Sequence, residues 1–318
     1  WYPVEPVAVT GQPTEVVNGI DLISEVLQPF IPGDLGGEVD TGAYRDAPAA
    51  TSDERFPVAA YSHGSPGYRQ AATFLTGHLA SHGVVTIAVE HLGRSLSTLL
   101  TPLAGADTAE DDVTDLLNAL DLVGDDPELG AVVDTSRMVV IGHSAGARTA
   151  ALATADDRVV GVVLLAGVPQ ELAANRPALM VVFENDAVID PASIWSLHLS
   201  LDNSIFVNIA GTGHAAPIDA CPLIQDRGGL TELREALGEA IVRLGEDGCL
   251  PKDTDARAVQ DLLRIYITGF AHEVLGLSAG PVGLTAEVAD LVAGVELQGF
   301  NEPPPLQSPT ANQESATT

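Results

Sequence analysis

Short runs rich in valine and isoleucine recur along the chain and constrain its fold more than any other feature. Both faces of these runs are apolar, which is typical of strands buried in a parallel sheet under helices. Stretches with helical patterning separate them, so the order of elements predicts βαβ crossovers. We expect strands at 56–62, 84–90, 137–142, 159–167, 178–184 and 204–211, and helices at 69–81, 111–123, 146–155, 191–201, 230–245 and 255–275.

The whole pattern predicts an α/β fold with a mostly parallel central sheet and helices on both faces. We expect a single domain over 1–300, in which 221–275 forms a C-terminal helical part. The first 55 residues, with scattered Pro and Gly, are expected to form edge strands and loops. The end of the chain, 301–318, has no apolar period and is expected to be a disordered tail.

A serine lies between two glycines directly after one expected strand and before an expected helix. Gly142-His143-Ser144-Ala145-Gly146 fits the pattern G-x-S-x-G, in which a sharp strand-to-helix turn exposes a nucleophilic serine. Glycines that only end a strand and begin a helix are the alternative. The strand, turn and helix context favours Ser144 as a nucleophile, because the helix N-terminus can stabilise a developing anion.

A serine hydroxyl is a weak nucleophile without a base, so a histidine and an acid should follow at the ends of later strands. Asp186 follows the strand ALMVVFE, and His214 follows SIFVNIAG. The order Ser, Asp, His is the one that α/β-hydrolases use. Asp190 is an alternative acid, but Asp190-Pro191 has the character of a helix N-cap.

The other histidines are alternatives to His214 as the base. His143 adjoins the nucleophile and is expected to point away from it. The others precede Ser144 or lie within expected helices: His63, His78, His82, His91, His198 and His272.

A serine nucleophile that attacks a carbonyl also needs two backbone N–H groups directed at the developing oxyanion. One should belong to Ala145, which follows the nucleophile, and the other to the loop HGSPGYR after the strand at 56–62. We assign the second donor to Ser65, because Pro66 has no N–H and Gly64 is needed for the turn. An ordinary Pro/Gly loop is the alternative.

Five segments together carry a family resemblance. The segments YSHGSPGYRQ, HLASHGVVTIAVEH, VVIGHSAGA, VVFENDAVIDP and IAGTGHAAP resemble secreted bacterial α/β-hydrolases that include cutinase-like polyester hydrolases and the platelet-activating-factor acetylhydrolase group. The resemblance covers roughly residues 55–220. It implies ester hydrolysis without a cofactor, and it implies the roles assigned above to Ser144, Asp186, His214, Ser65 and Ala145.

The sequence departs from the polyester hydrolases in the cleft. Ser65, Ala145 and Gly167-Val168 stand where those enzymes commonly carry an aromatic residue, a methionine and a tryptophan. Tyr68 and Trp195 are candidates to bind substrate in their place. We therefore expect a serine esterase for short- to medium-chain esters, with a polyester depolymerase, a lipase or an acetylhydrolase as alternatives. A non-catalytic hydrolase-fold protein that binds a partner is the alternative from another class.

The net charge of −30, from 44 acidic and 14 basic residues, argues against nucleic acid and anionic membranes as partners. Lys252 is the only lysine, so acidity extends over the whole surface and a salt-tolerant protein is expected. Apolar runs fall short of the roughly 20 residues that span a bilayer, so no membrane insertion is expected. We also expect a monomer.

No His or Cys cluster has metal-ligand spacing, so no metal is expected, and the acidic pairs Asp111-Asp112 and Asp125-Asp126 are the weaker alternative for calcium. Cys221 and Cys249 could close one loop as a disulfide, with two isolated thiols as the alternative. The sequence begins at Trp1 without an initiator methionine or signal-like segment, which favours a secreted protein whose signal peptide has been removed.

Overall fold

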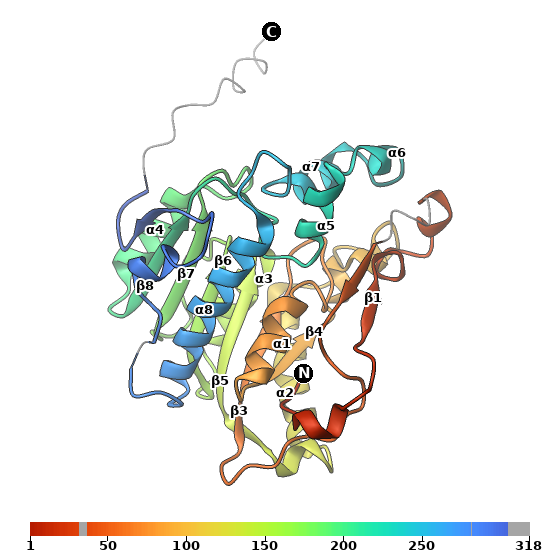
Figure 1. Cartoon of the computed structure of the whole chain (residues 1–318). Helices are drawn as coiled ribbons and strands as arrows, with labels where there is room; N and C mark the ends of the chain where they lie inside the picture. The colour runs from red at the N-terminus through yellow and green to blue at the C-terminus, as the bar shows by residue number, and fades with distance from the viewer. Residues whose placement is uncertain (32–36, 281, 305–318) are drawn as a thin grey trace.

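A seven-stranded sheet runs through the part of the molecule that the computed structural model describes, residues 1–31, 37–280 and 282–304 (Figure 1). The strand order is β4-β3-β5-β6-β7-β8-β9, and only the β8–β9 pair is antiparallel. The strands are β3 (Phe56–Ser62), β4 (Val85–Val89), β5 (Val133–His143), β6 (Val159–Leu165), β7 (Ala178–Phe183), β8 (Ser204–Ile209) and β9 (Leu297–Phe300). The predicted α/β fold with a mostly parallel sheet is confirmed.

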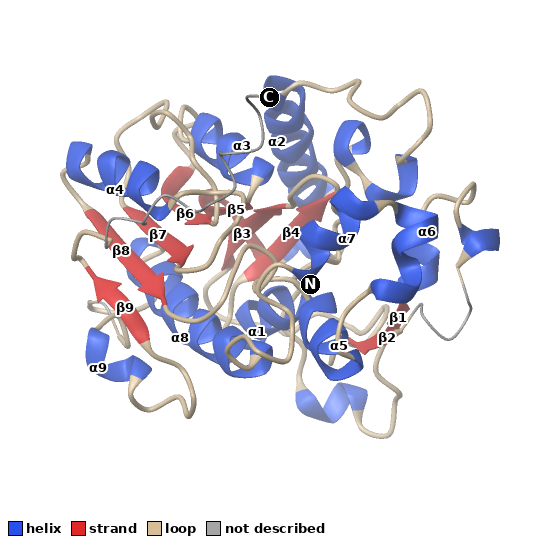
Figure 2. Cartoon of the chain, turned by 90° about the horizontal axis from the view of Figure 1, so that it is seen from above, coloured by secondary structure: helices blue, strands red, loops and turns tan. Residues whose placement is uncertain are grey.

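Helices cover both faces of the sheet, as Figure 2 shows. Side chains alternate along each strand, so Val139 and Ile141 pack toward the first group of helices below, whereas Val140 packs toward the second. The first group is α1 (Thr73–Ser81) and α8 (Ala256–Val274), and the second is α2 (Ala109–Asp125), α3 (Ala145–Ala153) and α4 (Pro191–Ser200). Two apolar layers, one on each side of the sheet, therefore form the core.

The segment expected as one helix at 230–245 is broken. Gly238 has φ of 83°, a left-handed conformation that ends a helix, although the apolar pattern continues beyond it. The described elements here are a 3-10 helix (Thr231–Leu233), α6 (Arg234–Leu237) and α7 (Glu239–Glu246), preceded by α5 (Ala220–Arg227). Figures 1 and 2 both place α6 and α7 on the same side of the molecule as β1 (Val16–Asn18).

Among the first 55 residues, the described ones (1–31 and 37–55) form short strands, turns and 3-10 helices along one edge of the sheet. β1 pairs antiparallel with β2 (Glu38–Asp40), and the N-terminal amino group of Trp1 donates to the carbonyl of Thr86 on the edge strand β4. Ile23, Leu27 and Ile31 pack against Leu233. This segment thus covers an edge strand and also contacts the region of α6.

The C-terminal strand β9 was not predicted from sequence. Asn301, the first residue of the expected tail, is bound to β8: its N–H donates to the carbonyl of Phe206, and its side-chain oxygen accepts from the N–H of Phe206 at 2.8 Å. Residues 305–318 of the expected tail lie outside the described residues. A short helix, α9 (Ala286–Ala289), precedes β9.

Cys221 on α5 and Cys249 after α7 form a disulfide across a sequence separation of 28. Closing a loop of this length stabilises a fold by about 3 to 4 kcal/mol in the chain-entropy model. Among the described residues, no helix combines the length and the hydrophobicity that crossing a bilayer requires.

Candidate active site

Ser144 stands at the turn between β5 and α3. Its φ is 54°, a conformation that non-glycine residues rarely adopt and that exposes the side chain at the top of the turn. A Cβ at Gly142 would collide with the carbonyl oxygen of Gly146, and a Cβ at Gly146 would collide with the carbonyl oxygen of Ser62 on β3. The two glycines are therefore required because backbone touches backbone on both sides of the serine.

His214 and Asp186 lie beside this serine at the ends of β8 and β7. The hydroxyl of Ser144 is 2.8 Å from Nε2 of His214, and Nδ1 of His214 is 3.0 Å and 3.1 Å from the two carboxylate oxygens of Asp186. Since a carboxylate only accepts, Nδ1 carries the proton and Nε2 can accept from the serine. The arrangement can move a proton from Ser144 to His214.

Main-chain groups hold the carboxylate of Asp186 in place. Its Oδ1 accepts from the N–H groups of Val188 at 2.8 Å and Ile189 at 2.7 Å. Asp186 is 6% exposed and His214 is 3% exposed, so both partners of Ser144 are shielded from water. Buried and multiply bonded, this carboxylate is rigidly directed at the imidazole.

Ser65 and Ala145, the expected oxyanion donors, flank the nucleophile. Ala145 is the first residue of α3, where backbone N–H groups have no acceptor within the helix. Gly64 lies against the nucleophile, since a Cβ built on it would be 3.1 Å from the Cβ of Ser144. Both Ser65 and Ala145 are exposed residues.

His143 has a role that sequence reasoning missed. Its Nε2 lies 3.0 Å from the carbonyl oxygen of His214 and must donate, because a carbonyl only accepts. Burial lowers the pKa of His143 to about 3, so its ring stays neutral. His143 therefore ties the turn containing the nucleophile to the main chain of the base. No local pattern could have revealed a contact between residues this distant in the sequence.

Asp247 is a second residue that the sequence did not single out. Its carboxylate accepts from the N–H of Ala187 at 2.9 Å, and its carbonyl accepts from the N–H of Ala215 at 2.8 Å. It therefore joins the loop of Asp186 to the loop of His214. Burial raises the pKa of Asp247 above its usual value. The disulfide between Cys221 and Cys249 anchors the segment that contains Asp247.

The alternative acid and bases have other partners. Asp190 accepts from the N–H of Ala192 and caps α4, as predicted. His198 bonds to Ser204 on β8. His78, His82 and His272 gather between α1 and α8, where Nε2 of His272 donates to the carbonyl of His82.

The two candidate substrate-binding aromatics differ in their surroundings. Tyr68 belongs to the loop that carries Ser65 and is half-buried against the core, and burial raises the pKa of its hydroxyl. The ring of Trp195 packs against those of His198, at 4.7 Å between centroids, and Phe206, at 5.1 Å. Trp195 is thus engaged in packing α4 onto β8.

Three of the four acidic residues considered for calcium, Asp111, Asp112 and Asp126, have partners within the protein. Asp111 completes a capping box with Thr108 at the start of α2, and Asp112 lies 3.0 Å from His91. Asp126 accepts from the N–H groups of Glu128 and Leu129. Over the described ranges, no group of three or more His, Cys, Asp or Glu residues is arranged to hold a metal ion.

Two comparisons with known proteins gave matches. The family model for platelet-activating factor acetylhydrolase, isoform II, matches residues 15–117, which include the loop of Ser65 and end before Ser144. A ferulic acid esterase from Streptomyces cinnamoneus is similar in structure, with a TM-score of 0.66 and 23% sequence identity over 94% of this chain and 87% of that one. The comparison with curated proteins gave no match.

The structural similarity shows that the protein has the α/β-hydrolase fold. The family match, over residues 15–117, agrees with the acetylhydrolase group named in the resemblance that the sequence motifs carry.

Proposed function

We propose that the protein is a serine carboxylic ester hydrolase that works through an acyl-enzyme. The observation that carries this proposal is the continuous chain of contacts from Ser144 through His214 to Asp186. His214 takes the proton of Ser144 as its oxygen attacks the ester carbonyl, and then gives that proton to the departing alcohol. Water attacks the acyl-enzyme with His214 again as the base, which releases the acid and restores Ser144.

The negative oxygen of each tetrahedral intermediate is assigned to the N–H groups of Ser65 and Ala145. Such donors stabilise the transition state because they are already oriented when charge develops. The N-terminus of α3 adds a favourable dipole at the same place.

Esters with short to medium aliphatic acyl chains are the substrates that this site favours. Ser65 and Ala145 have small side chains. Two exposed side chains near the triad are aliphatic: Val168, which follows Gly167 beside Ser144, and Val188, whose N–H donates to Asp186. A chain-length series of p-nitrophenyl esters from acetate to palmitate tests this. A short-chain phospholipid, a feruloyl ester and a polyester film test the alternatives.

Replacing the nucleophile tests the reaction. Ser144→Ala is expected to lower kcat on p-nitrophenyl butyrate by at least about 10⁴-fold, because a nucleophile in a triad acts as a unit with its base. A fluorophosphonate probe should label the wild type and not the variant. Ser200→Ala, at the end of α4, is the matched control and should keep full activity. A wild type that takes no label is the outcome expected of a non-catalytic binding protein.

We also propose that the protein is secreted. Its two cysteines are joined in a disulfide, and such bonds persist mainly in oxidising compartments.

A further inference from the structure

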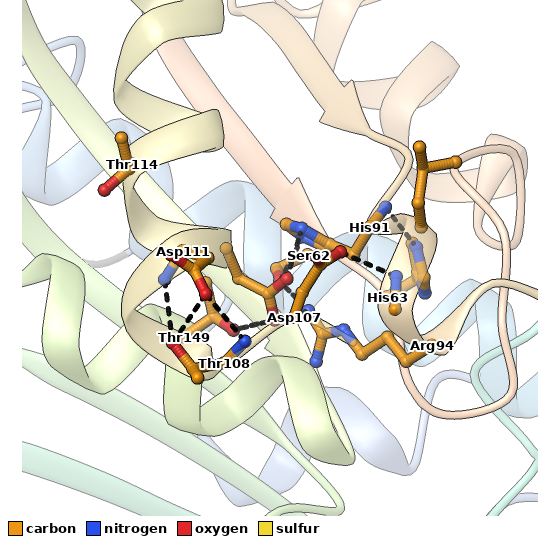
Figure 3. A network of polar contacts seen from close by, with 12 residues as sticks. Ser62, His63, His91, Arg94, Asp107, Thr108, Asp111, Thr114 and Thr149 are labelled. Carbon is orange, nitrogen blue, oxygen red and sulfur yellow. Dashed lines mark hydrogen bonds and ion pairs between the residues drawn. The ribbon is translucent and has the colours of Figure 1, made fainter. Parts of the chain in front are cut away.

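A second set of Ser, His and Asp residues lies outside the candidate active site, and Figure 3 labels two of its members, Ser62 and His91. Ser62 ends β3, His91 follows β4, and Asp112 lies on α2. Oγ of Ser62 is 2.9 Å from Nε2 of His91, whose Nδ1 is 3.0 Å from Oδ1 of Asp112. The order of contacts repeats that of Ser144, His214 and Asp186.

This second set is closed to substrates. Ser62 and His91 have no exposed surface, and Asp112 is 4% exposed. The guanidinium of Arg94 also donates to Oγ of Ser62 at 2.8 Å and lies 3.2 Å from Asp112. The network therefore fixes the segment at 91–94 against β3 and α2. The main chain of this fixed segment in turn binds a residue of the loop that carries Ser65.

The main chain of His91 holds the side chain of His63. The N–H of His91 donates to Nε2 of His63 at 3.0 Å, so this nitrogen carries no proton. The proton of the neutral ring is then on Nδ1, which donates to the carbonyl of Gly64 at 2.8 Å. Desolvation by burial lowers the pKa of His63 to about 3, so the ring stays neutral. The nearby His91 and Arg94 act in the same direction, whereas the bond to Gly64 and the charge of Asp112 oppose the shift.

That hydrogen bond sets the direction of the next amide. The carbonyl of Gly64 and the N–H of Ser65 belong to one trans peptide unit, in which they point in opposite directions. Holding the carbonyl toward His63 turns the Ser65 N–H away from His63. Since Gly64 also lies against Ser144, the N–H of Ser65 belongs to the loop that borders the nucleophile.

Two further features protect this arrangement. A Cβ on Gly67 would lie 2.6 Å from the carbonyl oxygen of Gly64 and 2.7 Å from Nδ1 of His63, so only glycine leaves room for their hydrogen bond. The N–H of Gly67 donates to the carbonyl of Arg94 at 3.0 Å, and its own carbonyl accepts from Leu96 at 2.7 Å. Gly67 is therefore attached through its main chain to Arg94, which the buried network holds, and to Leu96 just after it.

We propose that His63 is a positioning residue that orients the Ser65 N–H toward the oxyanion, and that Ser62, His91, Arg94 and Asp112 hold His63 in place for this purpose. The inference rests on the proposed esterase function, in which Ser65 is an oxyanion donor.

Replacing His63 by the two amide residues, Asn and Gln, distinguishes a role in orienting the Ser65 N–H from a role in packing alone. In His63→Asn the side-chain nitrogen can take the place of Nδ1 and keep the bond to Gly64, whereas in His63→Gln the amide takes the place of Nε2 and that bond is lost. We expect His63→Gln to lower kcat by about 10- to 100-fold with KM within about twofold, less than the loss of an entire donor. His63→Asn should stay within about threefold of the wild-type kcat.

A trifluoromethyl ketone gives a readout that packing alone would not move. It forms a hemiketal oxyanion with Ser144, so its inhibition constant should rise in His63→Gln by about the same factor by which kcat falls, and by much less in His63→Asn. Equal losses in the two variants, or wild-type values in both, would overturn the inference while leaving the wild-type esterase activity intact.

The wild-type protein provides a test that does not depend on a variant folding. Long-range ¹H–¹⁵N spectra should show His63 as the neutral tautomer protonated on Nδ1. The tautomer protonated on Nε2 would overturn the inference. A wild type without fluorophosphonate labelling would instead overturn the proposed function, and this inference with it.

Discussion

At the scale of single residues, the turn that carries Ser144 depends on glycines, which have no side chain to keep the neighbouring main chains apart. Gly142 and Gly146 allow α3 to approach β5 and β3 at backbone contact, and Gly167 lies against Ala147 and the carbonyl of Ser144. Ser144 itself adopts φ of 54°, which costs of order 1–3 kcal/mol for a residue with a side chain. The surrounding close contacts hold the serine in this unfavourable conformation.

Adding one methyl group at Gly146 should therefore destabilise the protein. We expect Gly146→Ala to lower the free energy of unfolding by at least about 2 kcal/mol, because the new Cβ would overlap the carbonyl of Ser62 and α3 must move. Urea unfolding measures the change. Gly77→Ala on α1 is the matched control, since its Cβ would make an ordinary contact of 3.5 Å with the carbonyl of Thr41. Equal effects of the two substitutions would contradict this explanation.

At the scale of elements, the start of α1 is decided by a residue far away in the sequence. The sequence pattern predicts a helix from 69, but α1 begins at Thr73 and its N-cap residue, Ala72, has no capping side chain. The carboxylate of Asp219 supplies the cap instead, accepting from the N–H groups of Thr73 at 2.6 Å and Phe74 at 3.0 Å. The helix thus begins where it meets the segment just before α5.

The Asp219 cap should make stability depend on pH. Burial raises the pKa of Asp219 to about 6, from 3.8, despite its hydrogen bonds. The folded state then binds a proton more tightly than the unfolded state, so the free energy of unfolding falls as pH rises from about 4 through about 6 and this contribution is constant above about 7. Over the range from pH 5 to pH 8, the expected fall is about 1 to 1.5 kcal/mol.

Urea unfolding at several pH values checks this expectation. Asp219→Asn should lose this part of the slope, because the amide does not titrate, whereas Asp53→Asn in an exposed loop should keep it. An unchanged slope in Asp219→Asn would show that other groups cause the pH dependence.

At the scale of the whole molecule, the dominant property is charge. With a net charge of −30, the surface carboxylates repel one another, and this repulsion disfavours the compact folded state. Arginine pairs locally with acids, for example Arg158 with Asp156 at 2.9 Å and Arg257 with Asp226 at 2.6 Å. The 14 basic residues are too few to give each of the 44 acidic residues a partner of its own.

Salt should therefore stabilise the protein and preserve its activity. The Debye length falls from about 10 Å at 0.1 M salt to about 3 Å at 1 M, which screens repulsion between surface carboxylates. We expect the free energy of unfolding to rise from 0.1 M to 1 M NaCl, with esterase activity retained. Sorbitol, which does not screen charge, is the control. A fall in stability with NaCl would contradict the expected salt tolerance.

Local patterns predicted much of this molecule. The strands from β3 to β8 are predictable from the sequence because each is an apolar run, and Ser144, Asp186 and His214 stand out because each follows such a run in the order of the fold. Features without a local pattern were missed. β9 is a short edge strand, LQGF, that is defined by pairing with β8, and the break at Gly238 lies inside a stretch whose apolar pattern continues.

By itself, the sequence determined the type of fold and the chemical groups of the candidate site, because hydrophobic periodicity and the glycines around Ser144 act over a few residues. The tertiary structure alone decided what holds those groups at reacting distance. Three sets of contacts join segments far apart along the chain. His143 binds the carbonyl of His214, Asp247 joins two loops, and the buried Ser62, His91 and Asp112 hold the segment whose main chain binds His63. Such contacts depend on the order of strands in the sheet, which is a property of the folded molecule.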